Sequence, residues 1–204
     1  MKYLLRLLMI ISVCGMSENL LARKSTVGIP LTMRVLTSGE MKTIYKLMRL
    51  KELHNRPDSY TSTFIRENAF KTHNWRARFN KGPVCGLFAK KACVGMVQLK
   101  YSRNERLNHI AELYGLYVEA EYAHDKAVVD DLIQYALEEA RKRATERVIL
   151  KLMRSDAWLE DVAKRNGFYL AWTQVGAVKT AQGDYRDLLV YEHVLRSANA
   201  QAEY

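Results

Sequence analysis

The segment from His124 to Val129 is the first candidate for ligand binding in this 204-residue sequence, because it opens a strongly patterned helix. Apolar residues recur there at helical spacing: Val128, Val129, Leu132, Ile133, Ala136, Leu137 and Ala140. The first amide groups of a helix lack partners within it, and the helix dipole favours negative charge, so a phosphate can bind there. His124 and Lys126 would attract a phosphate. Three aspartates would repel it or cap the helix themselves: Asp125, Asp130 and Asp131.

Glu112 is the second candidate for chemistry. It lies within Ile110–Val118, an apolar stretch that predicts a strand, and Gly115 inside it predicts a bulge or a close backbone approach. A buried carboxylate can have a raised pKa and can then accept a proton as a general base. The alternative is an ion pair with a neighbouring basic residue. His109, at the exposed start of this strand, is a weaker candidate base.

Other reactive patterns are missing from the sequence. It contains no glycine-rich P-loop, no serine nucleophile elbow and no CxxC pair. His54, His73 and His193 show no metal-ligand spacing. We expect Trp158, Phe168 and Trp172 to be core or half-buried aromatic residues.

The remaining patterns predict the elements that position these residues. We expect helices from Met41 to Pro57, over Thr63–Phe79, through the stripe after Lys126 and from Asp156 to Asn166. The expected strands are Met33–Leu36, Val84–Ala89, Ala92–Tyr101, Ile110–Val118, Val148–Met153, Tyr169–Val178 and Tyr185–Val194. Strand–helix–strand implies a right-handed parallel crossover. The fold class is therefore α/β, with a mixed, mostly antiparallel sheet flanked by helices.

Three stretches carry a resemblance to a known family. Arg49-Leu50, then Pro57-Asp58-Ser59-Tyr60-Thr61-Ser62-Thr63 and Trp75, is similar to an "R-L…P-x-x-F-x-S-T…W" opening. Ala111–Val118 leads into the striped helix, and Asp156 to Gly167-Phe168 is similar to "N-x-x-A-x-x-x-Y-x-x-x-G-F". Together with Gly183–Tyr191, their order resembles a divergent member of the GNAT N-acetyltransferase superfamily from Leu31 to Leu195.

The resemblance implies a cofactor and a reaction. Acetyl-CoA would be the co-substrate, with its pantetheine arm paired to the backbone of Leu116 and Val118. Its diphosphate would bind at the helix start, through His124, Lys126, Ala127, Val128 and Val129. Glu112, on the strand that lines the expected cleft, would take a proton from a primary amine that attacks the thioester directly.

Two departures from the family pattern open an alternative. Ala127 and Val129 replace the glycines of the Q/R-x-x-G-x-G/A loop, and Val129 adds a branched side chain where an amide should face phosphate. Ala163 stands where a leaving-group tyrosine is common, so Tyr117, Tyr169 or water would have to protonate the thiolate. The alternative is a catalytically inactive GNAT-fold protein with a binding or regulatory role.

The ends of the chain and its charge complete the expectations. We assign residues 1–30 to a leader or disordered extension, 31–197 to the acetyltransferase domain and 198–204 to a tail. A cytoplasmic protein is the first expectation, and export through the signal-like start is the alternative.

Ala89 opposite Ala92 would place Cys85 opposite Met96, which disfavours a Cys85–Cys93 disulfide. The net charge of +10 allows an anionic partner, but no nucleic-acid-reading motif is present, and no segment is long enough to span a membrane. The oligomeric state is left open.

Overall fold

A computed structural model of the chain describes residues 23–24, 29–180 and 183–195. The elements in chain order are β1 (Arg23–Lys24), β2 (Pro30–Val35), η1 (Ser38–Glu40), η2 (Met41–Tyr45), α1 (Lys46–Asn55), η3 (Pro57–Ser59), α2 (Phe64–Asn68), α3 (Thr72–Phe79), β3 (Val84–Ala89), β4 (Ala92–Tyr101), η4 (Glu105–Leu107), β5 (Ile110–Val118), α4 (Ala120–Ala123), α5 (Lys126–Arg141), β6 (Arg147–Met153), α6 (Ala157–Arg165), β7 (Tyr169–Lys179) and β8 (Tyr185–Val194).

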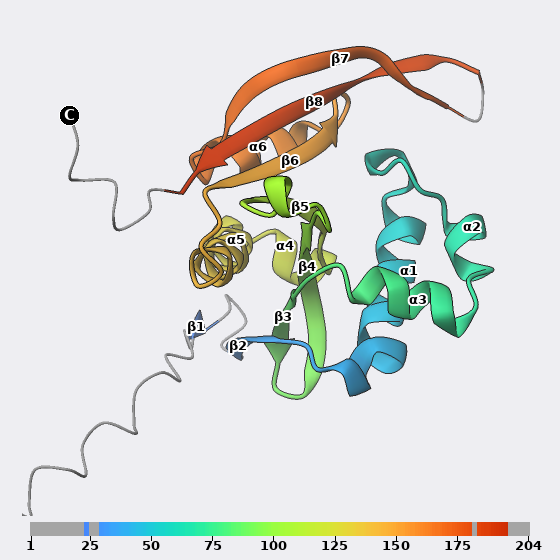
Figure 1. Ribbon diagram of the computed structural model, residues 1–204. Helices are drawn as coiled ribbons and strands as arrows, with labels where there is room; N and C mark the ends of the chain where they lie inside the picture. The colour runs from blue at the N-terminus through green and yellow to red at the C-terminus, as the bar shows by residue number, and fades with distance from the viewer. Residues whose placement is uncertain (1–22, 25–28, 181–182, 196–204) are drawn as a thin grey trace, which may run out of the picture.

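The strands form one eight-stranded sheet in the order β1-β2-β3-β4-β5-β6-β8-β7. Every neighbouring pair is antiparallel except β5 and β6, which are parallel and joined through α5. The predicted fold class is therefore confirmed. Figure 1 shows α1, α2 and α3 gathered at one side of the molecule, and the β7–β8 hairpin extended across the top.

Two apolar cores lie on opposite faces of the sheet. The larger one packs the buried stripe of α5 and the inner face of α6 against β2 to β6. The smaller one packs η2, α1 and Trp75 of α3 against the other face of β3, β4 and β5. Phe168 belongs to the larger core and Trp158 packs against it, as expected, but Trp172 is 44% exposed, so its expected burial is wrong.

Several expected boundaries need correction. The sheet already includes Arg23–Lys24, inside the expected leader; the rest of that leader through residue 28, and the tail, lie outside the described residues. The expected helix over Thr63–Phe79 is two helices, because the Asn74 side chain accepts from the Lys71 amide at 3.1 Å and starts a new helix there.

The β3–β4 register also differs from the expectation. Ala89 does pair with Ala92, but a bulge between Leu87 and Phe88 places Cys85 opposite Val97 instead of Met96. Cys85 and Cys93 are both free. Among the described residues, no helix has the length and apolar character needed to cross a membrane.

Gly115 forms the predicted bulge in β5. Gln98 pairs with Tyr114 and Met96 with Tyr117, so two residues of β5 face Val97 alone. Gly115 has φ +65°, the left-handed conformation that suits glycine at a bulge. The extra residue shifts the alternation of β5. Ala111 and Leu113 before the bulge and Leu116 and Val118 after it therefore all face the α5 core.

We expect Gly115→Ala to destabilise the fold by about 1–3 kcal/mol, because alanine is strained at this φ. Its Cβ would also lie 3.3 Å from Glu52 Oε2. Urea unfolding measures the change. The matched control is Gly39→Ala, whose Cβ meets nothing closer than 3.8 Å and which should lose no stability. Equal effects of the two substitutions would contradict the role of Gly115.

Candidate active site

The parallel strands β5 and β6 separate part-way along their length. Their pairing runs from Ile110 opposite Arg147 to Leu113 opposite Leu150. Beyond that point β5 continues to Val118 and β6 to Met153 without further pairing between them. The sheet therefore has an opening bounded by the second half of each strand, and unpaired strand edges expose backbone hydrogen-bonding groups.

The backbone groups of Leu116 and Val118 face this opening. The Glu119 amide donates to Val94 O at 2.8 Å across Gly95 and Val118, which makes that pair a non-hydrogen-bonded one. The amide and carbonyl of Val118 consequently point away from β4. The carbonyl of Leu116 does so as well, because it accepts a hydrogen bond from the Tyr60 hydroxyl at 2.8 Å. One accepted bond leaves the second lone pair of that carbonyl available.

A narrow cavity of about 70 Å³ marks the opening. Its lining comes from the segment after α1, from β5 and β6, and from one residue each of α6 and β8: Ser59, Tyr60, Thr61, Glu112, Leu113, Tyr114, Gly115, Leu116, Leu150, Lys151, Met153, Leu159 and Leu188. The lining has an apolar side and hydroxyl groups from two tyrosines. Such a slot suits an extended, mostly uncharged chain more than a compact ion.

The start of α5 is arranged differently from the expectation at Val129. Val128 and Val129 are each 1% exposed and belong to the α5 core, so the branched side chain of Val129 faces away from the helix start. The expected obstruction by Val129 is therefore wrong. Asp125 is what occupies this position: its Oδ1 accepts from the Ala127 amide at 3.1 Å, and its carbonyl accepts from the Val128 amide at 3.0 Å.

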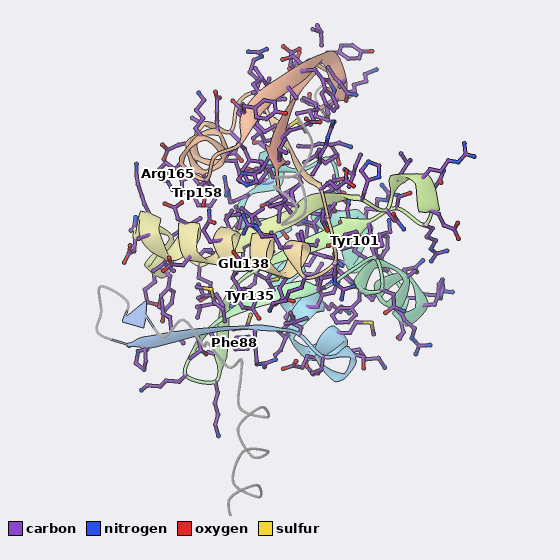
Figure 2. The ribbon with its side chains drawn as sticks, turned by 60° about the vertical axis from the view of Figure 1, so that its left-hand side comes forward. Phe88, Tyr101, Tyr135, Glu138, Trp158 and Arg165 are labelled. Atoms are coloured by element: carbon purple, nitrogen blue, oxygen red, sulfur yellow. The ribbon has the colours of Figure 1, made fainter. Side chains whose placement is uncertain are left out.

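Ion pairs balance the charges around this helix start. Arg165 of α6 binds Asp130 at 3.0 Å and also binds Asp161, and Asn166 donates to Asp130 at 2.7 Å. Lys126 pairs with Asp161 at 3.3 Å, where both side chains are well exposed. Figure 2 shows Arg165 and Trp158 of α6 beside the first half of α5. The repulsion expected from Asp130 is therefore largely compensated, and Asp125 remains the acidic group on the amides themselves.

Glu112 faces the side of the sheet opposite α5, between two lysines. Its Oε1 lies 3.1 Å from Lys100 Nζ, and its Oε2 lies 3.7 Å from Lys151 Nζ. The expected ion pair is thus present, and the carboxylate remains partly accessible at 24%. Glu112 lines both the narrow cavity and a larger one of about 890 Å³ beside it. His109 lies just before β5, where its carbonyl accepts from the Glu146 amide, and it lines neither cavity.

Comparison with known proteins decides what this arrangement is. A profile of the Acetyltransferase (GNAT) family matches residues 47–176, which is more than half of the chain and includes β5, α5 and β6. The chain belongs to the GNAT acetyltransferase family. No curated protein sequence matches it significantly.

Solved structures share the GNAT fold at low sequence identity. An acetyltransferase of the GNAT family from Streptococcus pneumoniae superposes with a TM-score of 0.70 at 14% identity, covering 81% of this chain and 99% of its own. The ribosomal-protein-alanine N-acetyltransferase from Brucella melitensis gives 0.65 at 20% identity, covering 80% and 99%. The protein yncA from Salmonella typhimurium, solved with its cofactor acetyl-CoA, gives 0.67 at 15% identity, covering 83% and 96%.

The hydroxyl groups of this GNAT site differ from those expected. Ala163 is 1% exposed in the α5 core and offers only a methyl group. Tyr117 accepts from Asn55 at 2.7 Å on the other face, and Tyr169 donates to Glu192 at the surface. The two tyrosines that line the opening are Tyr60 and Tyr114, which the sequence reasoning missed. The signal for Tyr60 was present, because it stands where the family opening has phenylalanine.

A buried charge cluster around Arg49 packs against these two tyrosines. Arg49 and two carboxylates are fully buried: Arg49 Nη1 lies 2.7 Å from Glu52, its Nη2 lies 3.0 Å from Glu67, and the same nitrogen donates to the Tyr114 hydroxyl at 2.5 Å. Arg78 adds a second cation 2.6 Å from Glu67. Two arginines thus face two carboxylates, and the Arg49 guanidinium also lies over the rings of Tyr60 and Tyr114.

Burial shifts the pKa values in this cluster in different directions. Burial raises the pKa of Glu52 although Arg49 opposes it, and burial next to Glu52 raises the pKa of the Tyr60 hydroxyl well above its ordinary value. Burial also acts to raise the pKa of Glu67, but the bonds from Arg49 outweigh it and leave that pKa lowered. Tyr60 therefore stays protonated at neutral pH and can donate a hydrogen bond.

We expect Arg49→Met to destabilise the protein by about 3–5 kcal/mol, because it leaves Glu52 buried without its cation. Chemical denaturation measures the loss. The matched control is Arg66→Met on α2, an exposed arginine for which the effect should stay within about 0.5 kcal/mol. If Arg49→Met were no more destabilising than the control, the cluster would not hold the α1 segment against β5.

Among the described residues, no group of three His, Cys, Asp or Glu side chains is arranged to hold a metal ion.

Proposed function

We propose that this GNAT protein transfers an acetyl group from acetyl-CoA to a primary amine by direct attack of the amine on the thioester. The observation that carries the proposal is the opening between β5 and β6, toward which the backbone groups of Leu116 and Val118 point. A pantetheine arm carries amide groups that can pair with such a strand edge. The presence of acetyl-CoA in the fold neighbour from Salmonella typhimurium supports the same assignment.

The helix start would hold the diphosphate of acetyl-CoA. The amides of Lys126, Ala127, Val128 and Val129 open α5, Lys126 supplies positive charge there, and His124 offers a ring N–H donor. The side chain of Val129 leaves room, because it is buried in the core. Binding requires the diphosphate to replace the Asp125 carboxylate at the Ala127 amide and to compete with the Asp125 carbonyl at the Val128 amide, so it costs the helix its cap.

The chemistry follows from the groups at the opening. The amine nitrogen forms a bond to the thioester carbonyl carbon, and the carbon–sulfur bond breaks. We assign Glu112 as the base that takes the proton from the amine, because it is the carboxylate shared by both cavities. The departing thiolate needs a proton in return. We assign that role to Tyr60, because its hydroxyl lines the opening and would turn from the Leu116 carbonyl to the sulfur.

Titration with acetyl-CoA tests the cofactor assignment. At about 100 times its Kd, the ligand should stabilise the fold by roughly 2.7 kcal/mol, measured as a thermal shift. Asp125→Asn keeps a capping side chain but removes one negative charge beside the diphosphate, so acetyl-CoA should bind about fivefold more tightly.

The control for this charge change is Asp184→Asn, on the exposed β7–β8 turn, which should leave the affinity unchanged. An Asp125→Asn protein with the wild-type affinity for acetyl-CoA would remove the helix start from the binding site. The absence of any acetyl-CoA binding would overturn the enzyme proposal.

Glu112→Gln tests the base. We expect kcat to fall by about 10²–10⁴, as for the loss of a general base, while the Kd for acetyl-CoA stays constant. Steady-state release of the CoA thiol gives kcat, and calorimetry gives the Kd. Glu146→Gln, an exposed glutamate before β6, is the matched control. Full activity of Glu112→Gln would leave Glu112 only its ion pairs with Lys100 and Lys151.

The second candidate is a catalytically inactive GNAT-fold protein with a binding or regulatory role. Two observations favour it: Asp125 already occupies the Ala127 amide, and Ala163 has no hydroxyl. The acetyl-CoA titration separates the two candidates, because an inactive protein that has lost the diphosphate contacts should not bind acetyl-CoA.

A further inference from the structure

The larger cavity lies beside the opening, on the face of the sheet away from α5. Its volume is about 890 Å³. The lining comes from the end of α3 and the loop after it, from the end of β4 and the loop with η4 that follows, and from the first halves of β5 and β6: Ala77, Asn80, Lys81, Lys100, Tyr101, Ser102, Arg103, Leu107, Ile110, Glu112 and Ile149. Its size is that of a small-molecule site.

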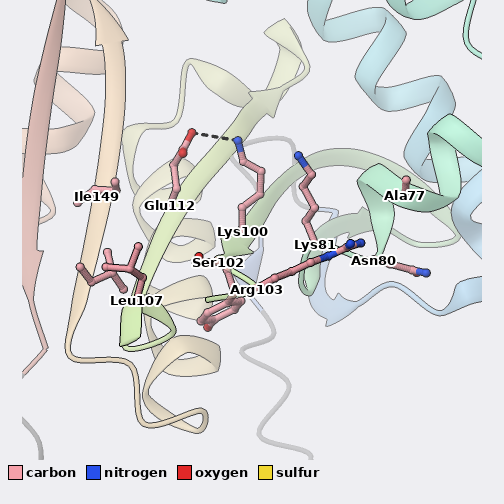
Figure 3. A pocket seen from close by; sticks show the side chains of 11 residues that line it. Ala77, Asn80, Lys81, Lys100, Ser102, Arg103, Leu107, Glu112 and Ile149 are labelled. Carbon is pink, nitrogen blue, oxygen red and sulfur yellow. Dashed lines mark hydrogen bonds and ion pairs between the residues drawn. The ribbon is translucent and has the colours of Figure 1, made fainter. Parts of the chain in front are cut away.

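The two walls of this cavity differ in character. Figure 3 shows Leu107 and Ile149 on one side, and Asn80, Lys81 and Arg103 on the other, with Lys100 and Glu112 joined by their ion pair between them. One wall can therefore pack against methylene groups. The other presents cationic groups to whatever fills the cavity.

The charges of the cavity are not balanced. Glu112 is its acidic lining residue, and Lys100 and Lys151 already share that carboxylate. Within the described residues, neither Lys81 nor Arg103 takes part in any ion pair. Burial lowers the pKa of Lys100, Glu112 opposes that shift, and the positive charges of Lys81 and Arg78 lower it further. The cavity thus has a surplus of positive potential.

Glu112 connects the two cavities and so orients an acceptor. We propose that the larger cavity binds the acceptor, and that this acceptor is a small aliphatic amine that also carries a carboxylate or a phosphate. Its ammonium end is attracted to Glu112, at the opening where the thioester would lie, and its anionic end to Lys81 and Arg103. The inference rests on the proposed function and names its substrate class.

The polarity of the cavity excludes other small acceptors. A diamine would bring its second cation toward Lys81 and Arg103, where like charges repel and no lining carboxylate compensates as Glu112 does at the other end. An amine without an anionic group would reach Glu112 but leave the two cations without a partner. The apolar wall of Leu107, Ile110 and Ile149 fits the methylene chain between the two ends of the proposed substrate.

Matched amines test this assignment by CoA-thiol release. The pairs are 4-aminobutyrate against 4-aminobutanamide, and O-phosphoethanolamine against ethanolamine. We expect kcat/KM to be about tenfold or more higher for the anionic member, as for a charge-assisted hydrogen bond, and the preference to shrink at high salt. The pair with the larger preference tells carboxylate from phosphate.

A double variant locates the preference. Lys81→Gln with Arg103→Gln should raise KM about tenfold for the amine that carries the anionic group, while kcat, the KM of its counterpart without that group and the Kd of acetyl-CoA stay unchanged. Lys90→Gln with Lys91→Gln removes the same charge at the exposed β3–β4 turn and should leave all four unchanged. An equal loss in both double variants would show only a general charge effect and would overturn the site.

The remaining outcomes separate this inference from the proposed function. If kcat/KM is equal for amines with and without the anionic group while acetyl-CoA still binds, the substrate class is overturned but the proposed acetyltransferase function stands. If acetyl-CoA does not bind and no amine is acetylated, saturation-transfer NMR tests whether the amines that carry an anionic group bind to the larger cavity on their own. Binding that the Lys81/Arg103 double variant loses supports the site, and no binding overturns it. A DNA oligonucleotide that binds through these cations, without any amine preference, also overturns it.

Discussion

The separation of β5 from β6 is the constraint on which the candidate site depends, and the bulge at Gly115 makes it possible. A regular strand would continue its pairing with both neighbours and leave no free edge in the middle of the sheet. The extra residue at Gly115 lets β5 keep its pairing with β4 through Val118 while its other edge leaves β6 after Leu113. The same shift keeps Leu116 and Val118 in the α5 core, so the free edge is anchored by buried side chains.

A buried charge cluster lies under this bulge. Glu52 lies close enough to Gly115 that a Cβ there would meet its carboxylate at 3.3 Å, and Arg49 ties Glu52 to Glu67 and Tyr114. Buried ion pairs are costly to desolvate and contribute more to defining one arrangement than to stability. Here they join α1 and α2 to β5. The hydroxyls of Tyr60 and Tyr114 at the opening are thereby placed by residues that contact no expected substrate.

The fold could be predicted largely from the sequence, because its signals were local or periodic. The stripe of α5, the glycine inside β5 and the strand–helix–strand order each reflect one element and its burial. The misplaced details depend on contacts between distant segments. The break between α2 and α3 and the β3–β4 bulge between Leu87 and Phe88 leave no periodic pattern in the sequence. Glu52 and Tyr60 come from a segment 50 or more residues before β5. Tyr60 matched the family opening, but no spacing rule could indicate that either residue would lie beside β5.

The helix start of α5 shows why replaced glycines are an ambiguous sign of lost function. What a phosphate needs is an accessible amide, and the side chain attached to that amide matters only if it points the same way. The side chain of Val129 points into the core, so its bulk does not cover the amide. The group that would compete with a diphosphate is the carboxylate of Asp125, the N-cap residue just before α5. This carboxylate stabilises the helix through its hydrogen bond from the Ala127 amide, which is the contact that a diphosphate would make. If the proposed diphosphate site is correct, helix stability and cofactor affinity oppose each other at this position, because Asp125 would have to release its cap before the diphosphate could bind.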